Sequence, residues 1–140
     1  MISLAVLVAV TLAAASSVHV YWAAGGRWGH GATLPERDGR PAFQPGPWST
    51  LLVAALLAMA GVVVLGRVGL GPAAHLGRLT HIGAWAVAAA FLLRGIGDFR
   101  LMGLFRREST TRFARWDRRV YTPLALALGV GVAIIAAGTT

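Results

Sequence analysis

An arginine and an aspartate four residues apart are the residues of this sequence whose types and spacing most directly suggest chemistry. Arg94 and Asp98 lie in an apolar segment, and on a helix this spacing would put them on one face. A charge near the middle of a bilayer costs about 2.5 to 3.5 kcal/mol on insertion scales, so such residues usually face a bundle interior and pair. Ala86 and Ala90 continue the same stripe, where a neighbouring helix could pack. The sequence therefore predicts a buried Arg94–Asp98 pair, which either serves a ligand or reaction or only fixes helix packing.

The composition is that of a membrane protein. The chain has 140 residues, of which 56% are hydrophobic, and its mean hydropathy is +0.67. The apolar fraction of soluble domains is about 45 to 50% even with glycine included, so we expect one membrane domain over residues 1–140. The absence of cysteine excludes disulfide exchange and thiolate chemistry. All 13 basic side chains are arginines, which excludes Schiff-base catalysis by lysine.

Four apolar segments predict an all-α fold, because each approaches the ~20 residues that a helix needs to cross the hydrocarbon. The expected spans are residues 2–22, 48–66, 79–99 and 121–138. Ser109, Thr110 or Thr111 could cap a short amphipathic helix in the membrane interface, and Thr122 before a proline predicts a break after it. The predicted fold class is a four-transmembrane-helix bundle with a short interfacial amphipathic helix before the last span. Glycine and proline mark residues 23–47 as a loop, in which regular structure is not expected over 25–31 and 41–47.

The arginines between the spans are distributed unevenly. Ten lie in the first and third connections, and the second connection has only Arg67 and Arg78. The positive-inside rule then predicts a multi-pass protein of the cell membrane with both termini outside the cytoplasm. Because the arginines adjoin apolar spans, we expect them to contact anionic lipid headgroups and do not expect nucleic acid as a partner. The residues predicted to contact headgroups are Arg106, Arg107, Arg112, Arg115 and Arg119.

In this orientation, polar and aromatic side chains from distant parts of the chain share the cytoplasmic end of the bundle. The predicted ligand-binding residues are His19, Tyr21, Trp22, Arg94, Asp98, Asp117 and Tyr121. Titratable groups that converge beside an apolar cavity are typical of a ligand site. His81 begins the third span at the opposite end, which argues against haem bound between two histidines, and no histidine shows metal-ligand spacing. We therefore expect neither a metal nor a cofactor.

Three stretches carry a resemblance to a known family. They read HVYWAAGG at 19–26, LRGIGDFR at 93–100 and RFARWDRRVYTPL at 112–124. Together they resemble the family of small bacterial membrane proteins catalogued as domain of unknown function 3995. The resemblance implies this architecture in a bacterial inner membrane and points to the same polar residues. It implies no activity.

Three functions stay open on the sequence alone. The first is binding of a small lipophilic or amphiphilic ligand, such as an isoprenoid, with Arg94 holding an anionic or carbonyl group. The second is a cofactor-free isomerase or cyclase, in which Asp98 or Asp117 donates a proton and His19 accepts one. The third is an accessory subunit of a membrane complex, and a homo-oligomer is open as well. Ion-coupled transport is disfavoured, because only the third span carries a deep charge.

Overall fold

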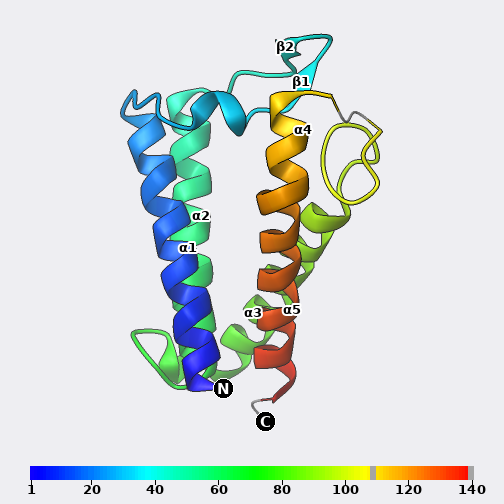
Figure 1. Cartoon of the computed structure of the whole chain (residues 1–140). Coiled ribbons are helices and arrows are strands. Elements are labelled where there is room, and N and C mark those ends of the chain that lie inside the picture. Colours follow the sequence, from blue (N-terminus) through cyan, green and yellow to red (C-terminus); the bar gives the residue numbers. More distant parts are fainter. Residues whose placement is uncertain (108–109, 139–140) are drawn as a thin grey trace.

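Four long helices dominate the fold (Figure 1). The computed structural model describes residues 1–107 and 110–138. The long helices are α1 (Ile2–Ala23), α2 (Pro47–Arg67), α3 (Gly77–Ile96) and α5 (Thr122–Gly138). Each lies in a helical segment that is long and apolar enough to cross a membrane, and α3 is preceded by the short 3-10 turn η2 (Ala74–Leu76). The prediction of an all-α, multi-pass membrane bundle is confirmed.

The bundle consists of two closely packed pairs, with α1 against α2 and α3 against α5 (Figure 1). Small residues allow this close approach. At Gly129 of α5, an added Cβ would lie 2.8 Å from Cγ of Leu92 in α3. On α3, Ala84 and Ala88 are buried, whereas the predicted packing residues Ala86 and Ala90 are exposed. The predicted packing face of the third span is therefore wrong, because α5 contacts α3 from a different side.

The connection between α1 and α2 contains more regular structure than predicted. It forms the 3-10 turn η1 (His30–Ala32) and a hairpin of β1 (Glu36–Arg37) and β2 (Arg40–Pro41). Asp38 and Gly39 at the hairpin tip have φ angles of 53° and 76°. Positive φ at two successive residues is what a type I′ turn requires, and Asp-Gly is a strong signal for it. This hairpin was not predicted from the sequence.

The third span ends earlier than predicted. Helix α3 stops at Ile96, and Gly97 after it adopts a φ of 88°. Glycine is the residue that tolerates such a left-handed conformation at a helix end. As a result, Asp98 lies outside the helix and does not share a helical face with Arg94.

The last span is one continuous helix of 27 residues, Arg112–Gly138. It begins with α4 (Arg112–Trp116), for which the Thr111 hydroxyl accepts a hydrogen bond from Ala114 N at 3.1 Å; Ser109 lies outside the described residues. The π-helical turn η3 (Asp117–Tyr121) then joins α4 directly to α5. The short helix was predicted at this place, but the expected break at Thr122 is wrong. A π-helical turn changes the hydrogen-bond register, and Pro123 just after it lacks the N–H that a regular helix would need.

Candidate functional site

The most deeply buried ionisable group of the described chain is the carboxylate of Asp117, whose exposure is 0%. Its Oδ1 accepts a hydrogen bond from Arg94 Nη2 at 2.7 Å. Its Oδ2 accepts from Arg106 Nη1 at 2.7 Å, from the backbone N of Gly103 at 2.8 Å and from Thr122 Oγ1 at 2.9 Å. A buried charge is tolerated when it is paired and its lone pairs are satisfied. This Asp117 network connects α3, the third loop (residues 97–111) and the last span.

The π-helical turn explains how Thr122 reaches Asp117. The two residues are five positions apart, which corresponds to the i to i+5 repeat of a π-helix. In a regular α-helix, the residues that face each other are three or four apart. The contact between Asp117 and Thr122 therefore cannot be predicted from regular α-helical spacing.

The third loop crosses itself so that Gly103 can donate to Asp117. Gly97 and Gly103 both have φ angles of 88°. A Cβ added to Gly97 would collide with the backbone of Met102 and Gly103, and a Cβ added to Gly103 would collide with the backbone of Ile96 and Gly97. The crossing is closed by a hydrogen bond from Leu104 N to the carbonyl oxygen of Gly95 at 2.9 Å. Only glycine fits at both positions.

Asp98 organises the start of this loop. Its Oδ1 accepts hydrogen bonds from the backbone N–H groups of Arg100, Leu101 and Met102 at 3.0, 2.8 and 3.1 Å. Burial raises the pKa of the Asp98 carboxyl, but the backbone donors outweigh it and hold the pKa below its usual value. Asp98 is exposed and acts as a local cap for the loop.

The predicted pair of Arg94 with Asp98 is therefore wrong. Arg94 does lie at a buried polar centre, but its partner is Asp117, 23 residues further along the chain. Two local features cause the difference: Gly97 ends α3 before Asp98, and the π-helical turn faces Asp117 toward α3.

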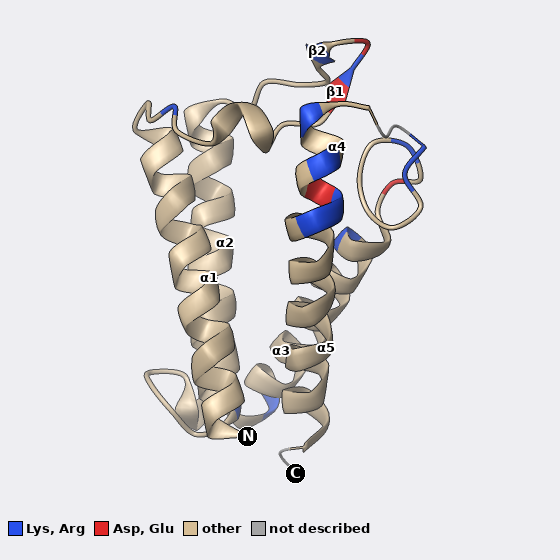
Figure 2. Ribbon diagram, viewed as in Figure 1, with Lys and Arg blue, Asp and Glu red and all other residues tan. Residues whose placement is uncertain are grey.

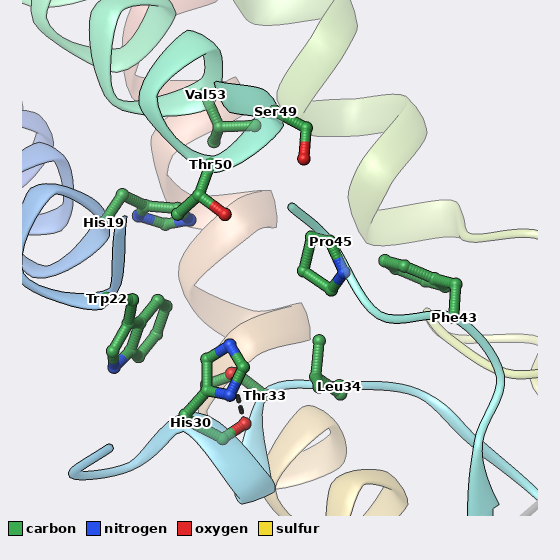
Figure 3. A pocket seen from close by; sticks show the side chains of 10 residues that line it. All are labelled: His19, Trp22, His30, Thr33, Leu34, Phe43, Pro45, Ser49, Thr50 and Val53. Carbon is green, nitrogen blue, oxygen red and sulfur yellow. Dashed lines mark hydrogen bonds between the residues drawn. The ribbon is translucent and has the colours of Figure 1, made fainter. Parts of the chain in front are cut away.

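A second candidate site is a cavity of about 400 Å³ between α1, the first loop and α2 (Figure 3). Figure 3 shows side chains from α1 on one side of it, α2 above, and the first loop opposite. The cavity is lined by His19, Trp22, His30, Thr33, Leu34, Phe43, Pro45, Ser49, Thr50 and Val53. We call it the α1–α2 cavity. Its wall is mainly apolar with a few polar groups, as in small-molecule sites.

The polar groups of the α1–α2 cavity offer acceptors. His19 Nδ1 lies 2.8 Å from the carbonyl oxygen of Ala15. A carbonyl only accepts, so Nδ1 carries the hydrogen and Nε2 of the neutral ring is left as an acceptor. The Thr50 hydroxyl already donates to the carbonyl of Gly46 at 3.0 Å, so its oxygen can accept from a ligand.

Trp22 forms a rigid aromatic wall beside these groups. Its ring has edge-to-face contacts with His19 at 5.1 Å and with His30 at 5.6 Å between ring centres. Its Nε1 donates to the carbonyl oxygen of Trp28 at 2.8 Å, which fixes the ring and removes its donor from the cavity. The indole face is thus available for apolar contact.

The remaining predicted site residues lie elsewhere. Tyr21 is 47% exposed and accepts a long hydrogen bond from the backbone N of Trp28 at 3.5 Å. Tyr121 packs against Phe113, with 6.1 Å between ring centres. The seven predicted residues are therefore divided. His19 and Trp22 line the α1–α2 cavity and Arg94 and Asp117 form the network, while Asp98 caps the loop and the two tyrosines join neither group.

Gly103 and Thr122 were not assigned to a site from the sequence. Arg106 was predicted to contact lipid headgroups. The Arg106 side chain is only 5% exposed and pairs with Asp117. The other arginines of that prediction are exposed, and Figure 2 shows most basic residues at the end of the bundle away from both termini. No three histidine, aspartate or glutamate side chains within residues 1–107 and 110–138 come together as metal ligands do.

Comparison with known proteins identifies one relationship. The chain has no significant match among curated proteins or among solved structures. A family profile described as "Protein of unknown function (DUF3995)" matches residues 7–132, which include both candidate sites and the three stretches that carry the resemblance. Since this match covers most of the chain, the protein belongs to the DUF3995 family of proteins of unknown function.

Proposed function

We propose that this protein binds a small amphiphile with a hydrogen-donating head group, such as an isoprenoid or fatty alcohol, in the α1–α2 cavity. The observation that carries the proposal is the cavity itself. Its volume of about 400 Å³ lies within the range of roughly 300 to 1,000 Å³ that is typical of small-molecule pockets. From the arginine distribution, we place the cavity at the cytoplasmic side of a bacterial inner membrane.

The lining chemistry supports a neutral ligand that donates. Nε2 of a neutral His19 ring and the oxygen of Thr50 can accept hydrogen bonds, and both residues line the cavity. The wall that surrounds them is apolar and includes Leu34, Phe43 and Val53. An alcohol would place its hydroxyl against the acceptors and its hydrocarbon against this wall. At these two acceptors a carboxylate would have no donor to offer, so they favour the alcohol.

In this proposal the Asp117 network supports the cavity without touching the ligand. The network fixes the third loop and the start of the last span, and α4 lies against η1 of the first loop. The buried residues Ala32 of η1 and Phe113 of α4 belong to these two neighbouring elements. In this proposal Arg94 holds the fold in place through its Nη2, which is engaged by Asp117.

The enzyme alternative draws less support from the geometry. Asp117 accepts four hydrogen bonds and Asp98 accepts three. A carboxylate that only accepts has no proton to give to a substrate. The His19 ring lies at a different cavity from both carboxylates, so the proposed donor and acceptor do not face one substrate.

Ligand binding to the purified protein in detergent tests the proposal. The probe is farnesol, with binding followed by tryptophan fluorescence. Val53→Trp should fill the cavity and remove binding, because Val53 lines it. The matched control is Val62→Trp on the same helix, since Val53 and Val62 are 41% and 39% exposed. Equal binding by both variants would contradict the proposal.

A further inference from the structure

A third feature of the structure is a cleft of about 350 Å³ between the third loop and the start of the last span. It is lined by Leu104, Arg106, Arg118, Thr122, Pro123 and Leu126. None of these residues lines the α1–α2 cavity. We call it the Arg106–Arg118 cleft.

The charge in and behind this cleft is positive and not fully balanced. The one carboxylate of Asp117 pairs with two guanidinium groups, those of Arg94 and Arg106. One positive charge is therefore left over in the network, and Arg118 adds a second at the cleft. Within the described residues, no ion pair engages Arg118. The balance of charge favours an anion in the cleft.

Arg106, which lines this cleft, carries a buried donor without a partner. The Arg106 side chain is 5% exposed, and its Nη1 is used by Asp117 and by the carbonyl oxygen of Gly103 at 2.7 Å each. Its Nε is buried and has no hydrogen-bond partner in the part of the chain that the structure describes. A buried donor without an acceptor costs stability, so a bound acceptor would offset this cost.

The other wall of the cleft is apolar and lies beside the start of the last membrane-spanning helix. Leu104, Pro123 and Leu126 form it, and the last two lie in α5. The helix Arg112–Gly138 has 27 residues and so extends about 40 Å, longer than the ~30 Å hydrocarbon core. Its basic first turns therefore reach the headgroup level, and the cleft lies where that basic part meets the apolar part.

From these observations we propose that the Arg106–Arg118 cleft binds a phosphate group, supplied by an anionic membrane phospholipid. Guanidinium groups recognise phosphate through paired, charge-assisted hydrogen bonds. The leucine and proline wall accommodates the glycerol backbone and the first methylenes of the acyl chains. The site is separate from the amphiphile cavity proposed above, so either can fail without the other.

Lipid titration of the purified full chain, followed by native mass spectrometry, tests this proposal. The probes are phosphatidylglycerol and a diacylglycerol with the same acyl chains. Wild-type protein should bind phosphatidylglycerol at least about tenfold more tightly, as expected for charge-assisted hydrogen bonds. Arg118→Gln should lose this preference. Arg119→Gln is the matched control, because Arg119 is an exposed arginine next in sequence that does not line the cleft, and it should keep the preference.

Three other results would overturn the proposal in whole or in part. Equal losses in Arg118→Gln and Arg119→Gln would show a diffuse surface charge effect and overturn the site. Equal affinity of the wild-type protein for the two lipids would overturn it as well. If inorganic phosphate displaced phosphatidylglycerol at comparable concentrations, the cleft would still be a phosphate site. The proposal that a phospholipid supplies the phosphate group would then be overturned. Both variants change exposed side chains, so circular dichroism should report an unchanged fold.

Discussion

Arg94 Nη2 and Asp117 Oδ1 lie 2.7 Å apart, although the two residues are 23 positions apart in the sequence. The pair links the end of α3 to the π-helical turn at the start of the last span. The same carboxylate accepts hydrogen bonds from Arg106 and Gly103 of the third loop. One buried side chain thus determines how the basic end of the α3–α5 pair is closed.

Replacing Asp117 should destabilise the protein more than any other single polar change at this end. Asp117→Asn keeps the size but leaves two guanidinium groups without their counter-charge. Removing one partner of a buried ion pair costs 3 to 5 kcal/mol, and we expect about 3 because Arg94 is 32% exposed at its side chain. Unfolding in mixed detergent micelles measures the loss. An Asp117→Asn protein as stable as the wild type would show that the network does not hold the fold.

The hydroxyl of Thr122 should contribute measurably to the same network. Thr122→Val removes the donor to Asp117 and leaves a buried acceptor short of one hydrogen bond, at a cost of about 1 to 2 kcal/mol. Thr11→Val is the control, because the Thr11 hydroxyl only donates to the Leu7 carbonyl within an exposed helix turn. Similar unfolding free energies for the two variants would argue against a specific role of the π-helical turn.

The glycine crossing of the third loop gives a prediction with an internal control. Gly103→Ala should disrupt the loop, because its Cβ would collide with Gly97 and with the carbonyl of Ile96. Gly69 has a similar φ of 80° but open space around it, so Gly69→Ala should cost only about 1 kcal/mol of backbone strain. Limited proteolysis of the third loop distinguishes the two. Equal protection in both variants would contradict the crossing.

Acidification should loosen the third loop before it unfolds the bundle. The pKa of Asp98 is lower in the folded protein than in the unfolded chain. The folded state therefore binds fewer protons, and the stabilisation by Asp98 is present above the unfolded pKa of about 4 and is lost as the pH falls through the folded value. Protection factors of the Arg100, Leu101 and Met102 amides, which correct for the pH dependence of intrinsic exchange, should fall once the pH drops below the unfolded value of about 4. In Asp98→Asn, this acid-dependent change should disappear; its persistence would assign the effect to another group.

Hydropathy alone was sufficient to predict the four spans, because an apolar run near 20 residues has few alternatives to a membrane helix. The cost of burying charge also singled out Arg94, which forms an ion pair with Asp117. Helical periodicity then failed at two points. The predicted helix continued past Gly97, whereas α3 ends at Ile96. Regular α-helical spacing also gave no contact between Asp117 and Thr122, which a π-helical turn brings within hydrogen-bond distance.

Of the residues that line the α1–α2 cavity, only His19 and Trp22 were among the predicted ligand-binding residues. His19 and Trp22 were selected because they end the first span. The opposite wall comes from η1 and from the segment before α2, whose path depends on the Asp38-Gly39 hairpin. Loop residues such as Phe43 carry no periodic signal that would place them over a particular helix.

The most direct test of the proposed function compares an isoprenoid alcohol with its methyl ether, which keeps the acceptor oxygen but lacks the donor. Because Nε2 of His19 and the Thr50 oxygen are acceptors, the wild-type protein should bind the alcohol about tenfold more tightly. His19→Phe should reduce that difference while retaining binding of the ether. Equal affinities of the wild-type protein for alcohol and ether would contradict the proposed recognition.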